Sequence, residues 1–230
     1  MMRKPFPSLL LLPVLLLLGA CSGIFNHTLG SVYPDMYANQ PASILVLPPV
    51  NNTTAADARE YFSCSLAEAL GLRGYYILPV ETMFNILRDE GLYNERNDDP
   101  AVLANFRKYF GADAVLYTVI EKWDKSWFLD SGSLTIQARF ALISTSSFET
   151  IWDYRTTIRV NLGSDSKKFL VKLIESAVKT AMEDYFPNAR EANILTFEKA
   201  LPYGKYHPLH GSDAEKWVNW NKTGSYEIDK

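Results

Sequence analysis

Residues 43–54 read SILVLPPVNNTT, and this stretch decides the class of fold. Its four consecutive apolar residues, Ile44 to Leu47, predict a short strand that is covered on both faces, as in a sheet with helices on each side. Pro48 and Pro49 end the strand, because proline donates no hydrogen bond to a neighbouring strand. We therefore expect an α/β domain.

Helices and strands alternate after this first strand. Apolar residues recur at helical spacing over 58–70, and YYILPV (75–80) predicts a second short strand. Two further helices are predicted over 81–92 and 99–111. The run ADAVLYTVI (112–120) predicts a third strand, again apolar on both faces.

The pattern then changes to strict alternation. LTIQARFALI (134–143) and IWDYRTTIRVNL (151–162) place apolar residues at every second position, which is typical of antiparallel strands with one exposed face. Residues 164–187 carry the strongest helical periodicity of the chain, and Pro187 is expected to end that helix. The order β-α-β-α-α-β-β-β-α predicts one α/β domain with a mixed sheet of about five strands and flanking helices.

Residues 1–20 have the pattern of a secretory signal peptide. Basic residues precede an apolar run of ten residues, 9–18, which is too short to cross a membrane because a spanning helix needs about 20. The step LGAC that ends at Cys21 resembles the bacterial lipobox, which implies that Cys21 is lipidated and that the leader is removed. Ser22, in place of aspartate, implies sorting to the outer membrane.

These segments divide the chain into four parts. We expect a signal peptide over 1–20, the lipidated cysteine with a flexible tether over 21–42, the α/β domain over 43–187, and a C-terminal extension over 188–230. The tether is predicted because its residues are polar and rich in glycine, proline and asparagine.

The charge balance excludes some classes of partner. Without its leader the chain has 21 basic and 26 acidic residues. This mild acidity argues against a nucleic-acid partner, which requires basic patches.

No pattern indicates catalysis, a cofactor or a metal. The sequence contains no phosphate-binding glycine loop and no Gly-x-Ser-x-Gly turn. His207 and His210 are spaced by three residues, but Pro208 disfavours a helix that would aim both at one metal. Cys64, the cysteine left after Cys21, is predicted to be a small buried apolar residue. We expect a protein that is not an enzyme.

Five aromatic residues are candidates for contact with a partner. Trp123, Trp127 and Phe128 fall in the apparent connection between two strands, where they either form a recognition edge or cover an open end of the sheet. Trp217 and Trp220 lie three residues apart and would share a face if they were on a helix. They could dock on their own domain, on a neighbour or at the membrane interface.

Four stretches together resemble one bacterial family: residues 44–54, GYYILPV (74–80), FGADAVLY (110–117) and LPYGKYHP (201–208). This is an uncharacterised lipoprotein family whose domain is similar to the N-terminal domain of TolB and to the periplasmic part of CsgG. Its genes often lie beside one for a CsgG-like lipoprotein. The family has no agreed catalytic residues, so none is carried over.

The resemblance and the lipobox together lead to one expected function and two alternatives. We expect a lipoprotein anchored in the outer membrane and facing the periplasm, which binds an envelope protein such as a CsgG-like lipoprotein as an adaptor or assembly factor. An envelope hydrolase acting on glycan or peptide is the first alternative. A self-assembling structural lipoprotein, which would be a homo-oligomer, is the second.

Overall fold

The computed structural model describes residues 27–93, 99–128, 131–161 and 181–229. Within these ranges it contains, in chain order, α2 (Leu29–Val32), α3 (Pro34–Asn39), β1 (Ser43–Val46), β2 (Val50–Asn51), α4 (Ala58–Leu72), β3 (Tyr76–Ile77), α5 (Val80–Asp89), α6 (Pro100–Phe110), β4 (Ala114–Phe128), β5 (Ser131–Ser144), β6 (Thr150–Asn161), α8 (Ala181–Ala200) and β7 (Thr223–Asp229).

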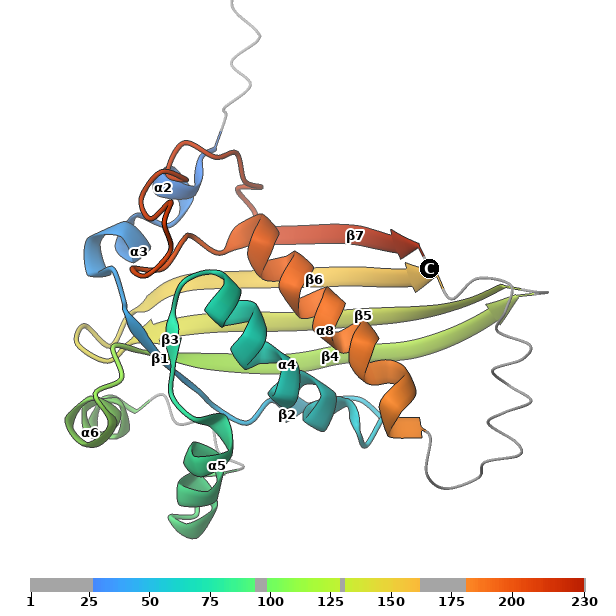
Figure 1. Cartoon of the computed structure of the whole chain (residues 1–230), viewed down its shortest axis with the longest axis horizontal. Helices are drawn as coiled ribbons and strands as arrows, with labels where there is room; N and C mark the ends of the chain where they lie inside the picture. Colours follow the sequence, from blue (N-terminus) through green and yellow to red (C-terminus); the bar gives the residue numbers. More distant parts are fainter. Residues whose placement is uncertain (1–26, 94–98, 129–130, 162–180, 230) are drawn as a thin grey trace, which may run out of the picture.

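The strands form one mixed sheet in the order β3-β1-β4-β5-β6-β7, with β2 also paired to β4 (Figure 1). The pairs β4–β5 and β5–β6 are antiparallel, whereas β1, β2 and β7 pair in parallel with their neighbours. The predicted order of nine elements is present. Within the described ranges the sheet has seven strands instead of about five, because β2 and β7 were not predicted.

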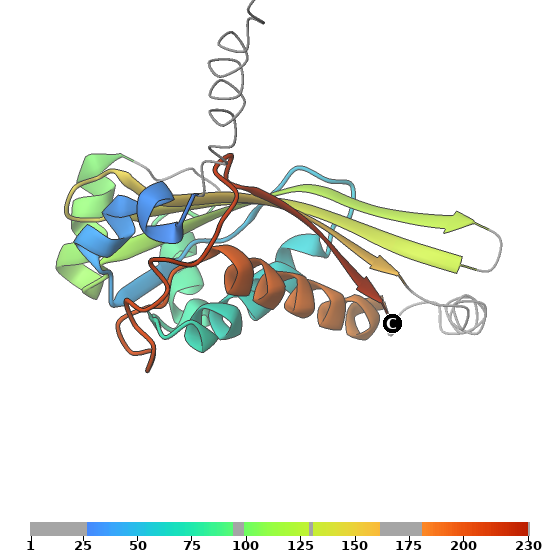
Figure 2. The same cartoon turned by 90° about the horizontal axis from the view of Figure 1, so that it is seen from above.

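One face of the sheet carries the main core, covered by α4 and α8 (Figure 2). The alternating apolar positions of β5 and β6 point to this face: Leu134, Ile136, Phe140, Trp152 and Ile158 have no exposed surface. The prediction of two strands with one apolar face is therefore confirmed.

A second core lies on the opposite face, at the β3–β1 end of the sheet. There Leu45 and Leu47 of the first predicted strand pack with residues of α5 and α6, while Ile44 and Val46 belong to the main core. This strand is covered on both faces, as its unbroken apolar run predicts.

Residues 29–39 differ from the predicted flexible tether. They form α2 and α3, and both Leu29 and Tyr33 are almost fully buried. Thr28 caps α2 through a capping box, and the Tyr33 hydroxyl donates to the Asp153 carbonyl at 2.9 Å. A few well-placed apolar residues among polar ones thus attach this segment to the core; residues 21–26 lie outside the described residues.

The predicted end of the last helix at Pro187 is wrong. Helix α8 runs through Pro187 to Ala200, although an interior proline costs a helix about 3 kcal/mol. Burial of apolar side chains after Pro187 offsets this loss, since Ala189 and Phe197 are fully buried in the main core. The part of this predicted helix before residue 181 lies outside the described residues.

The predicted C-terminal extension, 188–230, is likewise part of the domain. The second half of α8 packs on α4, and β7 adds a strand beside β6. No helix in the described ranges is both long and apolar enough to span a bilayer.

Candidate functional site

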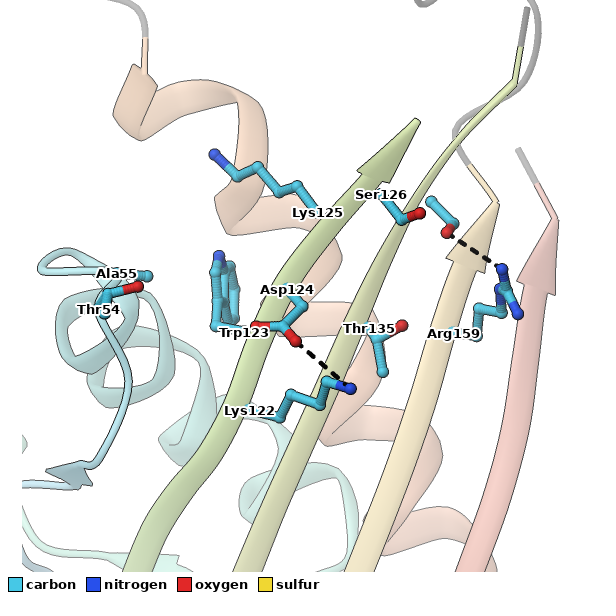
Figure 3. A pocket seen from close by; sticks show the side chains of 10 residues that line it. Thr54, Ala55, Lys122, Trp123, Asp124, Lys125, Ser126, Thr135 and Arg159 are labelled. Atoms are coloured by element: carbon cyan, nitrogen blue, oxygen red, sulfur yellow. Dashed lines mark hydrogen bonds and ion pairs between the residues drawn. The ribbon is translucent and has the colours of Figure 1, made fainter. Parts of the chain in front are cut away.

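The longest strand, β4, has an open edge over half of its length. β1 pairs with β4 as far as Leu116, and β2 pairs with Val119 and Ile120. From Glu121 to Phe128, no strand in the described part of the chain pairs with that side of β4. A depression of about 640 Å³ surrounds this edge (Figure 3). Its lining residues are Thr54, Ala55, Lys122, Trp123, Asp124, Lys125, Ser126, Ser133, Thr135 and Arg159.

A β-bulge at Glu121 determines which side chains face the depression. The register between β4 and β5 shifts between Ile120 and Lys122, so one extra residue is inserted and the alternation is reset. Ile120 and Trp123 are three positions apart, and both are consequently buried on the face that α4 and α8 cover, which we call the packed face. Lys122 and Asp124 lie on the opposite face of the sheet, which we call the bare face.

The bulge also builds a cluster of charges. The Glu121 carboxylate accepts hydrogen bonds from Arg139 and Arg155, the latter from Nε at 2.7 Å. Burial raises the pKa of the Glu121 carboxyl, but the hydrogen bonds and positive charges of the two arginines outweigh it and leave this pKa below its ordinary value. One carboxylate held between two guanidinium groups leaves a net positive charge on the bare face.

The remaining polar groups of the depression suit binding. Lys122 Nζ lies 3.3 Å from an Asp124 carboxylate oxygen, and the Arg159 guanidinium donates to Ser133 Oγ at 3.4 Å (Figure 3). Among the described residues lining the depression there is a single carboxylate and no histidine. The arrangement offers exposed donors and acceptors next to an unpaired strand edge, which is the geometry that accepts an added strand.

The predicted connection over 121–130 is a strand as far as residue 128. Trp123, Trp127 and Phe128 lie on β4, and the backbones of the last two pair with Gly132 and Ser131. The prediction failed because the strand's alternation is broken at the bulge. The Trp123 ring stacks on Tyr61 at 5.7 Å and is only 6% exposed, so it covers the core.

Trp217 and Trp220 are not on a helix. Trp217 forms an isolated bridge with Thr28, and Trp220 lies in a turn before β7. The two residues are 58% and 67% exposed, so neither indole is buried against its own domain. Trp217 and Trp220 are therefore exposed in a loop, whereas Trp123 is buried in the main core. Cys21 lies outside the described residues.

Three further residues that the sequence analysis singled out are placed by the structure: Cys64, His207 and His210. Cys64 is exposed on α4, where burial of part of the thiol, with Glu60 and Glu81 nearby, raises its pKa; the prediction of a buried residue is wrong. The His207 ring stacks on Tyr203, and the His210 ring is hydrogen-bonded to the Tyr203 carbonyl.

A buried ion pair near the β3–β1 end was missed altogether. Arg73 and Asp213 lie 3.5 Å apart with side chains 7% and 3% exposed. The Asp213 carboxylate also accepts from the Tyr203 N–H at 2.7 Å and from the Tyr37 hydroxyl at 3.0 Å. The Arg73 guanidinium lies 3.8 Å from the centre of the Tyr203 ring. We call these four residues the latch, because they fasten the segment after α8 to the end of α4.

The stretch LPYGKYHP (201–208) runs through the latch. The Gly204 N–H donates to the Arg73 carbonyl at 2.7 Å, and the Tyr206 N–H donates to the Gly74 carbonyl at 3.0 Å. Gly74 has a φ of +83° and lies against the backbone of His207. The motif is thus explained by close backbone packing, which glycine permits.

Comparison with known proteins identifies the family. The family model described as "Putative lipoprotein GNA1162-like" matches residues 32–213. The "Putative lipoprotein NMB1124/NMB1162" of Neisseria meningitidis serogroup B is 26% identical over 146 residues, which are 64% of this chain and 68% of that protein.

Two solved structures are also similar. The crystal structure of lipoprotein GNA1162 from Neisseria meningitidis has 25% identity and a TM-score of 0.48, covering 60% of this chain and 98% of that one. The PelC dodecamer from Paraburkholderia phytofirmans has 16% identity and a TM-score of 0.42, covering 69% and 86%. The GNA1162-like family model matches residues 32–213, which are most of the chain, and this protein therefore belongs to the GNA1162-like lipoprotein family.

Proposed function

We propose that this protein is an outer-membrane lipoprotein, facing the periplasm, that acts by binding and not by catalysis. It would be an adaptor or assembly factor in envelope secretion or transport. Cys21 would carry the lipid anchor, and the open edge of β4 would be the docking site for an envelope protein. Membership of a lipoprotein family supports the anchor.

The observation that carries this proposal is the open edge of β4 from Glu121 to Phe128, lying in a polar depression. An unpaired edge presents backbone N–H and C=O groups that a strand of another protein can use. This edge carries two features that disfavour non-specific pairing with other strands: the bulge at Glu121 and the exposed Lys122 and Lys125. A specific partner must therefore satisfy these charges.

The charges of the edge define the chemistry of the partner. Lys122, Lys125 and Arg159 line the depression, against one carboxylate from Asp124. The Lys125 ammonium lies 3.9 Å from the centre of the Tyr185 ring, and its partial burial lowers its pKa. A strand with carboxylates opposite the lysines would fit best. A CsgG-like lipoprotein, which the family resemblance implies, is the candidate partner.

Site-specific crosslinking in intact cells tests the docking site. A photoreactive residue replaces Ser126, which is exposed on the open edge, and in a matched variant it replaces Tyr109, which is exposed on α6. We expect Ser126 to capture one envelope protein that Tyr109 does not, and we expect Lys122→Glu with Lys125→Glu to abolish that capture. Equal capture at both positions, or none at Ser126, would contradict the proposal. Capture of a second copy of the chain would favour self-assembly instead.

The anchor is tested separately by Cys21→Ser. We expect the protein to move from the membrane fraction to the soluble fraction, because the acyl chains hold it to the bilayer. Mass spectrometry of the native form should find acyl mass on Cys21. A Cys64→Ser variant is the control and should remain with the membrane. If the Cys21→Ser protein still sediments with envelopes, the proposed anchor is wrong.

A further inference from the structure

Two exposed tryptophans lie beside the point at which the described chain begins. Thr28 pairs with Trp217 in an isolated bridge. The His27 carbonyl accepts a hydrogen bond from the Val218 N–H at 2.9 Å, and the centres of the His27 and Trp220 rings are 6.4 Å apart. Both figures show this C-terminal loop beside α2 (Figures 1 and 2). The two indoles therefore occupy the end of the domain from which the N-terminal segment leaves.

The length of that segment limits the distance between the indoles and the membrane. Only five residues lie between Cys21 and His27, so six Cα–Cα steps join the two. However they are arranged, they span at most about 20 Å, since an extended chain covers about 3.3–3.6 Å per residue. If Cys21 is lipidated, as the proposed function holds, this end of the domain lies at or near the bilayer surface.

The exposure of the two side chains calls for a partner. Trp217 is 58% and Trp220 is 67% exposed, whereas Trp123 and Trp152 are buried in the core. Indole combines a large apolar ring with one polar N–H, which is why tryptophan is enriched at the boundary between the headgroups and the acyl chains. We propose that Trp217 and Trp220 insert into the headgroup region of the bilayer and form a second membrane contact beside the lipid anchor.

The neighbouring cations indicate which lipids this contact needs. Lys216 Nζ donates to the Glu198 carbonyl at 2.8 Å, and Lys222 is paired with Asp153. The two lysines that flank the tryptophans in the sequence are thus engaged within the domain. The contact is made by indole rings, so it requires no anionic lipid and resists salt, which screens charges but not apolar insertion.

A photoreactive lipid tests the proposal on the whole lipidated protein. The protein is reconstituted in vesicles of phosphatidylethanolamine and phosphatidylcholine that contain a phospholipid with a diazirine near its headgroup. After illumination, mass spectrometry reads both the acyl mass on Cys21 and the lipid adducts on each peptide. We expect adducts on the peptide with Trp217 and Trp220, at low and at high salt. Tyr109 on α6 is also 67% exposed, and its peptide should carry none.

The variant Trp217→Ser with Trp220→Ser supplies the matched comparison. Both positions are exposed, so the fold should be retained, and adducts should fall to the level of the Tyr109 peptide while the acyl mass on Cys21 persists. Acylated Cys21 without adducts at Trp217 and Trp220 would overturn this inference and leave the proposed anchor intact. Absence of acyl mass would instead overturn the anchor, and this inference with it.

Discussion

Both ends of the sheet carry an ion pair between arginine and a carboxylate, but the two pairs differ in their exposure to solvent. At the packed end, near β3 and β1, the latch buries Arg73 against Asp213 with almost no exposed surface. At the open end, Glu121 is paired with Arg139 and Arg155, whose side chains remain 58% and 47% exposed. The same kind of ion pair therefore stands in two very different environments.

This difference separates stability from binding. A buried charge whose partner is removed stays in a medium of low polarity, so the loss is large. An exposed pair is screened by water and contributes little. We therefore expect the packed end to determine whether the protein folds, and the open end to be free to contact a partner. Three substitutions test this comparison, in order of decreasing effect.

Breaking the latch should have the largest effect. Asp213→Ala leaves the Arg73 guanidinium buried, where its Nε already has no hydrogen-bond partner among the residues that the structure describes. We expect the free energy of unfolding to fall by about 3–5 kcal/mol, measured by urea denaturation. At the open end, Asp124→Ala removes one partner of the exposed pair with Lys122 and should cost less than about 1 kcal/mol. Equal losses in the two variants would contradict the comparison.

Gly204 tests the backbone packing of the same latch, with a smaller effect. A Cβ atom on Gly204 would lie 2.5 Å from the Gly74 carbonyl oxygen and 2.8 Å from a ring carbon of Tyr75. Because one of these atoms belongs to the backbone, the clash cannot be relieved by rotating a side chain. We expect Gly204→Ala to cost about 1–3 kcal/mol, measured by thermal or urea unfolding.

The control for Gly204 is another glycine close to the latch in the sequence. Gly71 lies in α4, and a Cβ there would meet nothing within 4 Å. Gly71→Ala should therefore stabilise the protein by about 0.5–1 kcal/mol, because alanine favours a helix more than glycine does. If Gly71→Ala lowered the stability instead, α4 would not continue as a helix through Gly71 to Leu72.

Much of the packed half of the molecule could be predicted from the sequence. The alternation from Leu134 to Leu142 correctly assigned the buried face of β5, and α6 begins at Pro100, capped by Asp99, within the helix predicted over 99–111. These features depend on local periodicity and local hydrogen bonds. Strand β7 was missed because TGSYEID (223–229) has only one well-buried apolar residue, Ile228.

The two charge clusters could not be predicted, for different reasons. Arg73 and Asp213 are 140 residues apart, and nothing in their neighbourhoods marks them as partners. The bulge at Glu121 leaves two buried residues, Ile120 and Trp123, three positions apart instead of two. A strand with this spacing breaks the alternation of period two and is therefore mistaken for a turn. A spacing of three within a long apolar strand, flanked by aromatic residues, is the signal that could have indicated a bulge.

Glu121→Gln should have the smallest effect, and its dependence on pH identifies the cause. The pKa of Glu121 is lowered in the folded protein, so its contribution is fully present above the carboxyl's unfolded value and is lost as the pH falls through the folded one. At pH 7 the variant should be less stable by under about 1 kcal/mol, since both arginines are half-exposed. The difference should vanish below the folded pKa, as measured by urea unfolding at neutral and acid pH. Glu149→Gln, on the exposed turn before β6, is the control and should show no such trend. A loss that persisted at acid pH would mean that Glu121 acts by packing and not by its charge.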